Sequence, residues 1–254
     1  MQNMHYCIYG RNIMTKLSNT FFLIVLFIFD CEQREVYYSD LANKEAPSSL
    51  VVFYERASTV TSCGVKCLND NCCIRFIYNK MNKQCVGIHV LEKSGYSYQQ
   101  VPPISPVAQQ FVKGCGSDWV EFQGHCYSYG QQTVTWFDAK LRCQNMCSYL
   151  VEIDDREESD WLFKTFVEKG SCSTNLYTSN CSAWTGGNDL VNEGHYVMDH
   201  SNTSIVFTNW HTGEPSLHDP SQAPGRDCID IIGNGKWNDR PCSHNNKFIC
   251  EKII

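Results

Sequence analysis

Oxygen-bearing side chains gather in three short stretches towards the C-terminus of this 254-residue chain. They are Glu214-Pro-Ser216, Asp227 and Trp237-Asn-Asp239. Calcium takes about six to eight oxygen ligands from carboxylates, amides and carbonyls, and it tolerates irregular loop geometry. A cis peptide bond before Pro215 would turn Glu214 and Ser216 to the same side, although only a minority of such bonds are cis. We therefore expect these stretches to form a calcium site.

The remaining reactive side chains do not indicate catalysis. No Ser or Cys is paired with a His in a local catalytic signature. Several histidines lack the i, i+4 helical pairing of a zinc enzyme and are expected on the surface: His195, His200, His211, His218 and His244. The sequence predicts a binding protein and not an enzyme.

The charge pattern excludes one class of partner. The formal net charge is −6, and no run of Lys or Arg is longer than a pair. Nucleic-acid binding needs a basic patch that neutralises phosphates. We expect no nucleic-acid binding, and a neutral or cationic partner.

The cysteine content and the N-terminus indicate an extracellular protein. Sixteen cysteines are far more than a cytosolic protein keeps reduced. Arg11 and Lys16 precede an apolar run from Phe21 to Phe29, which is too short for a membrane span of about 20 residues. We expect residues 1–31 to be a signal peptide and the mature protein to be secreted, without stable membrane insertion. An uncleaved anchor is the alternative.

The composition divides the mature chain into two cysteine-bearing modules. Residues 100–113 contain Pro102, Pro103 and Pro106, no cysteine and no helical or strand periodicity, which is typical of a semi-extended linker. The modules on either side are residues 36–99 and 115–252. Both carry helical and strand patterns, so we expect the α+β fold class.

The N-terminal module combines a short helix with a strand. Cys63 and Cys67 are four residues apart, which places both sulfurs on one helical face, and Cys73 opens an alternating strand. This stretch resembles a PAN/apple-like module, whose members usually mediate protein or sugar contacts. The resemblance implies the bridges Cys63–Cys85 and Cys67–Cys73, with Cys72 left over. Spacing alone leaves other pairings open, and a zinc site is a further alternative.

The C-terminal module is expected to hold two helices that flank a mainly antiparallel sheet. A hairpin turns at Gln123-Gly124, Thr135 caps the first helix, and Asp155 caps the second, which Gly170 ends. The apolar positions of the two helices are Trp136, Ala139, Leu141 and Cys143, then Trp161, Leu162, Thr165 and Phe166. The expected strands that follow are Ser182–Gly187, Ile205–Trp210, Cys228–Ile232, Lys236–Asn238 and Lys247–Glu251.

The motifs of this module together resemble the C-type lectin family. The matching stretches are Cys115, Cys126, Cys143, Ala183-Trp-Thr-Gly-Gly187, Thr208-Asn-Trp210, Glu214-Pro-Ser216, Cys228, Trp237-Asn-Asp239, Cys242 and Phe248-Ile-Cys250-Glu251. The resemblance implies a C-type lectin-like fold with a long calcium loop. It also implies the bridges Cys115–Cys126, Cys143–Cys250 and Cys228–Cys242.

The resemblance further implies a primary calcium site at which two vicinal sugar hydroxyls complete the metal shell. On matching positions its ligands are Glu214, Ser216, Asn238 and Asp239. The mannose-type loop of the family has Asn where this chain has Ser216, and Glu where it has Arg226. An amide oxygen and a carboxylate are therefore replaced, and the guanidinium would repel the ion. The loop from Leu217 to Asp227 is longer than the family pattern, and its Asp219 could supply the lost oxygen.

A second, structural calcium site of the family has partial matches. Asp189, Glu193 and Asp227 lie at its positions, and Leu217 replaces one carboxylate. The alternative is that Asp189 and Glu193 are solvated loop charges. Tyr196 and His211 are candidates for stacking on the apolar face of a sugar, and three tryptophans are expected in the core, namely Trp184, Trp210 and Trp237.

Three cysteines of the C-terminal module lie outside the family bridges, and we expect Cys172 to pair with Cys181 because that closes the shortest loop. Cys72 and Cys147 then remain, and they either meet across the linker or cross-link two chains into a dimer. Asn202-Thr-Ser204 and Asn180-Cys-Ser182 are candidate glycosylation sites, of which Asn202 is favoured because Asn180 lies beside a bridge.

Two functions from different classes agree with these features. The first is a secreted, calcium-dependent lectin that binds glycans or glycoproteins in surface recognition or innate defence, with Ca²⁺ as its cofactor. The alternative is a calcium-independent C-type lectin-like domain that binds protein, which Ser216 and Arg226 favour.

Overall fold

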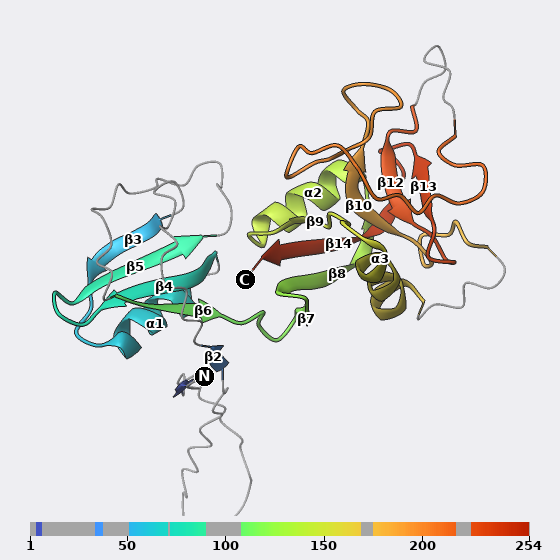
Figure 1. The fold of residues 1–254 in the computed structure, drawn as a ribbon. Coiled ribbons are helices and arrows are strands. Elements are labelled where there is room, and N and C mark those ends of the chain that lie inside the picture. The colour runs from blue at the N-terminus through green and yellow to red at the C-terminus, as the bar shows by residue number, and fades with distance from the viewer. Residues whose placement is uncertain are drawn as a thin grey trace, which may run out of the picture. The chain divides into compact units, whose positions relative to one another are not determined.

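The computed structural model describes residues 4–6, 34–37, 51–70, 72–89, 108–168, 175–216 and 225–253. The chain divides into two compact units, one formed by Met1–Ile88 with Tyr98–Gly116 and the other by His89–Ser97 with Ser117–Ile254 (Figure 1). The apolar run of the expected signal peptide lies outside the described residues. Within those ranges, no helix has the length and apolar character needed to cross a membrane.

The N-terminal unit is built on a six-stranded sheet with the order β1-β2-β6-β4-β5-β3. Its strands are β1 Met4–Tyr6, β2 Arg34–Tyr37, β3 Val51–Arg56, β4 Cys73–Asn79, β5 Gln84–His89 and β6 Gln109–Lys113, and its helix is α1 Val60–Asn69. Strand β6 falls in the segment for which we expected an extended linker. It pairs with β2 and β4, so that expectation does not hold for residues 109–113. The backbone groups of β4 need partners, and sequence periodicity does not show where they come from.

Helix α1 is joined to the sheet by two disulfides. Thr59 and Ser62 form a capping box at its start, where the Ser62 N–H donates to Thr59 Oγ1 (3.1 Å). Two bridges, Cys63–Cys85 and Cys67–Cys73, tie the buried face of the helix to β5 and β4. These are the pairings that the family resemblance implied.

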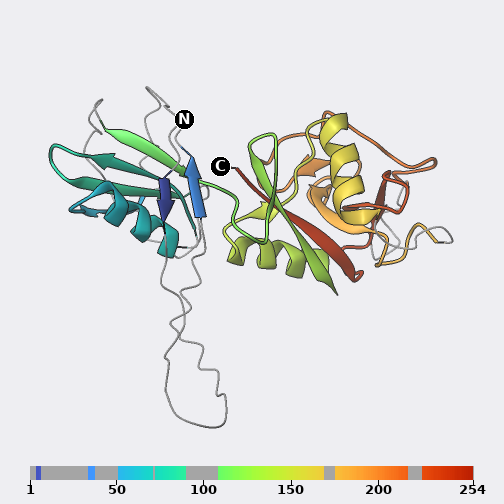
Figure 2. The ribbon, with the colours of Figure 1, turned by 90° about the horizontal axis from the view of Figure 1, so that it is seen from below.

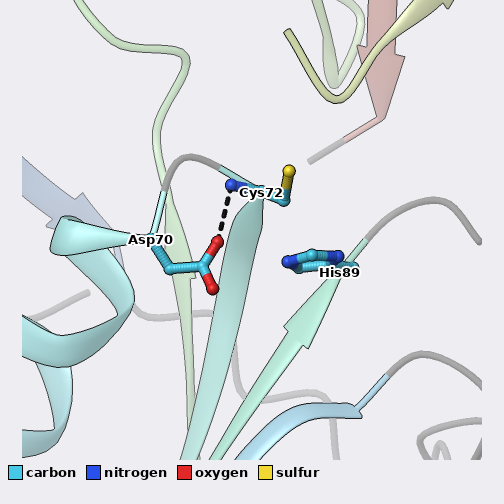
Figure 3. A group of neighbouring side chains, drawn as sticks. All are labelled: Asp70, Cys72 and His89. Atoms are coloured by element: carbon cyan, nitrogen blue, oxygen red, sulfur yellow. Dashed lines mark hydrogen bonds between the residues drawn. The ribbon is translucent and has the colours of Figure 1, made fainter. Parts of the chain in front are cut away.

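Among the described residues, one group of side chains has the composition of a metal site, and it lies at the turn after α1 and the end of β5. Asp70, Cys72 and His89 place potential ligand atoms within 4.8 Å of one another (Figure 3). The Asp70 carboxylate, however, accepts the N–H of Cys72 (2.8 Å) and of Cys73 (3.1 Å). Cys72 is also disulfide-bonded, so its sulfur is no thiolate ligand and the group is part of a stapled turn.

The C-terminal unit contains an eight-stranded sheet flanked by two helices (Figures 1 and 2). The main strand order is β13-β12-β10-β14-β8-β7, with β11 beside β10 and β9 beside β14. The strands are β7 Val120–Phe122, β8 His125–Val134, β9 Tyr149–Leu150, β10 Ala183–Asn188, β11 Val197–Met198, β12 Cys228–Ile231, β13 Trp237–Arg240 and β14 Asn246–Ile253. The pairs are antiparallel except for β10 with β14. The expected helix-flanked, mainly antiparallel sheet is thus confirmed.

Local sequence signals account for several of these elements. Gln123 (φ 49°) and Gly124 (φ 82°) make the turn between β7 and β8 in the left-handed region, as a two-residue hairpin requires. Thr135 caps helix α2, Trp136–Asn145, and Asp155 caps helix α3, Arg156–Leu162, each through the N–H three residues on. A π-helical stretch, Phe163–Val167, continues α3, and the expected end at Gly170 lies outside the described residues.

Two predictions about this unit are wrong. Leu141 is 55% exposed and does not belong to the buried face of α2, which consists of Trp136, Ala139 and Cys143. The segment Ile205–Trp210 is not a strand, because only isolated bridges occur at Ser204 and Trp210. Its backbone bonds to β13 in a loop, where the Trp237 N–H donates to the Asn209 carbonyl (2.8 Å). The apolar spacing of this segment predicts that its side chains are buried, but it does not determine the secondary structure of its backbone.

The core of the unit is aromatic and disulfide-bonded. Trp184 and Trp237 are buried as expected, and Trp210 is partly buried and packs against the cluster that contains Trp237. The bridges Cys143–Cys250 and Cys228–Cys242 are those that the resemblance implied. The other cysteines of the described residues are also disulfide-bonded, including Cys115, Cys126, Cys147 and Cys181. Cys72 and Cys147 are therefore both disulfide-bonded, and the expectation that they pair with each other or cross-link two chains stays a prediction. Cys172 lies outside the described residues.

Candidate functional site

Strand β13 presents Asn238 and Asp239 beside the loop that carries Glu214 and Ser216. The register of β13 on β12 pairs Asn238 with Asp230 and Asp239 with Ile229. The Glu214–Pro215 peptide bond is cis, as the sequence interpretation suggested for a loop of this kind. The structure thus brings together the four residues expected at the primary site.

Asp239 is the centre of this group. Its carboxylate is fully buried. Oδ1 accepts the N–H (3.1 Å) and the hydroxyl (2.9 Å) of Ser216, and Oδ2 accepts the hydroxyl of Tyr196 (3.3 Å). These bonds hold the Ser216 end of the loop against β13.

Glu214 lies against the carboxylate of Asp239. Its Oε2 is buried and has no hydrogen-bond partner. Burial and the neighbouring Asp239 carboxylate raise the pKa of Glu214 above its ordinary value. A buried carboxylate oxygen without a partner is costly, so this position fits a bound cation.

Arg226 reaches the same group from the other end of the loop. It is exposed, and its Nη1 donates to Ser216 Oγ (3.2 Å). Its charge opposes the rise in the pKa of Glu214. The Ser216 hydroxyl is therefore shared between Asp239 and a guanidinium, which makes it a weaker calcium ligand than the amide that the family pattern has there.

The residues expected at the second calcium site also come together. Asp189 is 2% exposed; its Oδ2 accepts the Gly194 N–H (2.8 Å), and its Oδ1 is buried without a partner. Its pKa rises to about 6, first through burial and then through the carboxylates of Glu193, Asp227 and Asp239. This arrangement contradicts the alternative in which Asp189 is a solvated loop charge, and it fits a cation as Glu214 does.

The two acidic groups form one continuous region. Asp239 belongs to the first group and also raises the pKa of Asp189 in the second. Tyr196 lies between them, and burial, Asp239 and Asp189 raise its pKa. The Tyr196 ring packs on Trp210, with the ring centroids 5.0 Å apart, and its hydroxyl is used by Asp239. Tyr196 therefore helps to position Asp239, and its stacking on a sugar stays a prediction.

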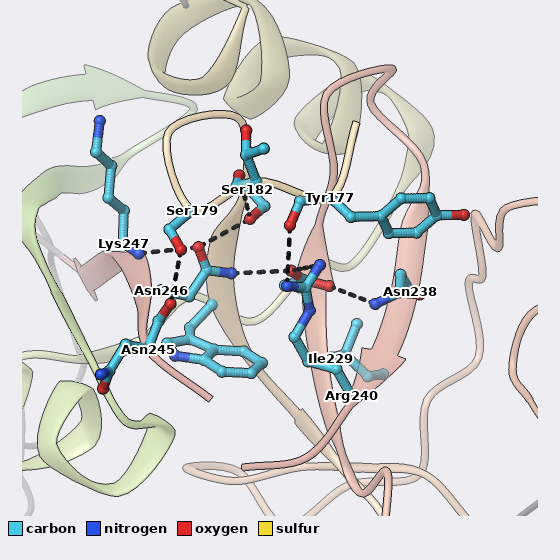
Figure 4. A network of polar contacts seen from close by, with 12 residues as sticks. Tyr177, Ser179, Ser182, Ile229, Asn238, Arg240, Asn245, Asn246 and Lys247 are labelled. Carbon is cyan, nitrogen blue, oxygen red and sulfur yellow. Dashed lines mark hydrogen bonds and ion pairs between the residues drawn. The ribbon is translucent and has the colours of Figure 1, made fainter. Parts of the chain in front are cut away.

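A buried polar network lies under Asn238 (Figure 4). The Asp230 carboxylate accepts hydrogen bonds from Nδ2 of Asn238 (3.0 Å) and of Asn246 (2.8 Å). It also forms an ion pair with Arg240 Nη2 (2.9 Å). Arg240 Nη1 donates to the Tyr177 carbonyl (3.1 Å). Because the amide nitrogen of Asn238 is committed to Asp230, its oxygen is the atom that it can offer to a metal. We did not predict Asp230 and Arg240 as part of the site, although a charged residue within the apolar stretch Cys228–Ile232 is a signal that could have pointed to the first.

A hollow of about 420 Å³ adjoins the primary site. Its lining residues come from the two ends of the loop that runs from Glu214 to Arg226, from β13 and from the segments before β10 and after β13: Tyr177, Glu214, Arg226, Asn238, Arg240, Pro241 and His244. His211, the other expected stacking residue, does not line it and instead packs edge-on to Tyr177, with the centroids 6.1 Å apart. Leu217 and Asp219 lie outside the described residues, so the structure does not test the expected substitute ligand.

Comparisons with known proteins agree with this fold. The model of the Lectin C-type domain family matches residues 132–252. The mouse CD209 antigen-like protein C is 31% identical over 158 residues, which are 61% of this chain and 79% of that protein. The mouse low affinity immunoglobulin epsilon Fc receptor is 30% identical over 140 residues, 55% of this chain but only 37% of the receptor. A human scavenger receptor C-type lectin carbohydrate-recognition domain is 33% identical and fully covered, by 56% of this chain, with a TM-score of 0.49.

The fold and the paired acidic groups define a C-type lectin-like domain. The chain belongs to the C-type lectin family, and its relatives support a lectin-like role for the C-terminal unit. It spans less than half the length of some curated relatives, such as the mouse Fc receptor.

Proposed function

We propose that the C-terminal unit is a calcium-dependent lectin domain that binds glycans or glycoproteins. The observation that carries this proposal is the buried, unpartnered Oε2 of Glu214, which lies against the buried carboxylate of Asp239. Two adjacent carboxylates are stabilised by a divalent cation more than by any neutral group. Asp189 Oδ1 is also buried without a hydrogen-bond partner, which supports a second cation in the neighbouring group.

Each residue of the primary site has a distinct role in the proposal. Glu214, Asn238 and Asp239 would hold the ion through carboxylate and amide oxygens, with Ser216 as a weaker hydroxyl ligand. Calcium, when bound, offers open coordination positions to vicinal hydroxyls of a sugar. Asp189, Glu193 and Asp227 would hold the second ion and fix the loop between Asp189 and Gly194. Within the protein, Asp239 positions Ser216, and Asp230 orients Asn238.

The test uses the full chain, secreted from a eukaryotic host and passed over mannose- and galactose-bearing resins. We expect retention in calcium and release by a chelator. Asp239→Ala should abolish retention while secretion continues. Asp160→Asn, an exposed charge change on α3, is the control and should bind normally. Retention that ignores the chelator, or no binding to either resin and to a wider glycan panel, would overturn the proposal.

A second function is favoured by one contact. Arg226 Nη1 donates to Ser216 Oγ (3.2 Å), so a cationic side chain already partly occupies the site. A domain in this state would bind a protein without calcium. The mouse relative named as an immunoglobulin epsilon Fc receptor is, by its name, a receptor for a protein. Calcium-independent capture of a protein partner that survives Asp239→Ala is the outcome that selects this function.

For the rest of the chain we propose secretion after removal of residues 1–31, which include strand β1, and a PAN/apple-like adhesion module at residues 36–99. Two features support an oxidising compartment: no cysteine among the described residues is free, and α1 is stapled to β4 and β5. Asn202, on an exposed turn, is the proposed glycosylation site, and Asn180 is the second. Mass spectrometry of the secreted protein, before and after glycosidase treatment, tests the processing and both sites.

A further inference from the structure

The hollow beside the calcium loop is lined by more positive than negative side chains. Arg226 and Arg240 contribute two guanidiniums, and Glu214 is the one carboxylate among its described lining residues. In the proposed function Glu214 is a calcium ligand, so its charge would be directed to the ion. Burial and the Arg240 charge lower the pKa of His244, which leaves this lining residue neutral at pH 7. Arg240 is paired with Asp230, so the guanidinium of Arg226 is the exposed positive charge among the described lining residues.

The two guanidiniums differ in what they can offer to a ligand. Arg240 is 7% exposed and is engaged by Asp230 and by the Tyr177 carbonyl. It therefore shapes the wall of the hollow. Arg226 is exposed, and its described hydrogen bond goes to a neutral hydroxyl. In the part of the chain that the structure describes, no carboxylate forms an ion pair with Arg226, so its charge is available to a ligand.

The hollow also has an exposed aromatic wall. Tyr177 is 40% exposed, and its ring meets His211 at an interplanar angle of 87°, which fixes its orientation. An exposed ring of this kind can stack on the apolar face of a sugar while its hydroxyl stays in water. Tyr177 is therefore a further candidate for stacking on a sugar, which we also expected of Tyr196, whose hydroxyl is bound to Asp239.

From these observations we propose that the hollow binds an acidic sugar, with Arg226 pairing with the carboxylate or sulfate of that sugar and Tyr177 stacking on its ring. This inference rests on the proposed calcium-dependent lectin function and specifies its ligand class. A guanidinium matches the geometry of a carboxylate or sulfate with two parallel N–H donors. An acidic sugar is not the neutral or cationic partner that the overall charge suggested. The net charge of a chain does not determine the charge of the residues that line one hollow.

The test measures binding of the full chain, in calcium, to one polymer scaffold that carries neutral, sialylated, glucuronylated or sulfated sugars. We expect at least about tenfold tighter binding of an acidic form than of its neutral counterpart. At saturating calcium, Arg226→Gln should remove this preference, and the neutral sugars should bind at least as tightly as to the parent, because the guanidinium no longer competes for Ser216. Arg156→Gln removes an exposed positive charge outside the hollow and should keep the preference. Tyr177→Ala should weaken neutral and acidic sugars alike.

The outcomes separate the two proposals. Calcium-dependent binding of neutral sugars without a preference for acidic ones, or a preference that survives Arg226→Gln, overturns the acidic-sugar inference and leaves the lectin function standing. No calcium-dependent binding of any form overturns both. The sialylated, glucuronylated and sulfated arms show whether the acidic group is a carboxylate or a sulfate, and a preference for either one supports the inference.

Discussion

Two buried aspartates on adjacent strands of the same sheet differ in whether a positive charge lies beside them. Asp230 on β12 is fully buried, and its carboxylate meets Arg240 and the amides of Asn238 and Asn246. Asp239 on β13 is equally buried, but it accepts only from the neutral hydroxyl and amide groups of Ser216 and Tyr196 among the described contacts.

The difference separates charges that build the fold from charges that hold a ligand. The Asp230 charge is compensated by a guanidinium inside the protein, so nothing from solution is needed there. Around Asp239 several negative charges lie close together. Its neighbours Glu214 and Asp189 each have a buried carboxylate oxygen without a hydrogen-bond partner. The sheet therefore supports the site with a neutralised network and leaves the loop side short of positive charge.

The largest effect is expected from breaking the compensated pair. Arg240→Leu leaves Asp230 buried without its cation, and we expect a loss of about 3 to 5 kcal/mol in the free energy of unfolding. Urea unfolding should show the same loss in calcium and in chelator, because the pair serves the fold. The double variant Asp230→Asn with Arg240→Leu should recover much of it. A loss confined to calcium buffer would contradict the distinction between the two aspartates.

The uncompensated side should respond in the other direction. Asp239→Asn should abolish calcium binding at the primary site and the stabilisation that comes from that site, which is about 2.7 kcal/mol at a calcium concentration one hundred times Kd. In chelator the variant should be as stable as the parent or more stable, because the repulsion of Glu214 is removed. Unfolding curves over a calcium titration measure both terms. An unchanged calcium response would remove Asp239 from the site.

Arg226 allows the strength of the primary site to be raised. Arg226→Glu removes the guanidinium from Ser216 and restores the carboxylate of the family pattern, and we expect calcium to bind about tenfold more tightly, equivalent to about 1.4 kcal/mol. Calorimetric titration with calcium is the measurement. Arg156→Glu, with the same charge change on an exposed turn of α3, should leave the affinity within about twofold, since distant surface charges are screened.

Acidification is the mildest of these perturbations. The pKa of Asp189 is raised from 3.8 to about 6 in the folded protein, so its contribution to stability is fully present below pH 3.8 and is lost as the pH rises through about 6. The calcium-free protein should therefore gain stability from Asp189 as the pH falls from 7 to 5. Over the same range, calcium should dissociate as the ligand carboxylates become protonated.

Other carboxylates titrate in the same direction, so the Asp189 effect must be isolated. Burial raises the pKa of Asp230 to about 6 and that of Glu158 to about 7. The difference in unfolding free energy between the parent and Asp189→Asn, measured in chelator at each pH, removes these shared contributions. A difference that does not change between pH 7 and pH 5 would show that Asp189 does not carry a raised pKa.

Local signals in the sequence predicted much of the fold. Thr135 and Asp155 were identified as helix caps because their oxygens suit the free N–H groups of a first turn, and both act so. The turn at Gln123-Gly124 and four disulfide pairs also agree with expectation. Each of these features depends on a few neighbouring residues or on a family spacing that is visible in one sequence.

Predictions that depended on distant neighbours were less successful. Leu141 has helical spacing but faces solvent, since the sheet covers only one side of α2. Residues 109–113 carry no strand pattern but pair with β4, and the apolar segment Ile205–Trp210 runs as a loop. In each case a contact remote in sequence decided the outcome.

The sequence by itself determined which oxygen-bearing residues this protein has. It also showed that their spacing matches the pattern of a calcium-binding lectin loop. Only the tertiary structure decided which of them are neutralised. Asp230 and Asp239 have the same side chain, and what separates them is whether a guanidinium lies within reach across the sheet. Coulombic interactions depend on distance and burial in space, which the order of residues along the chain does not contain.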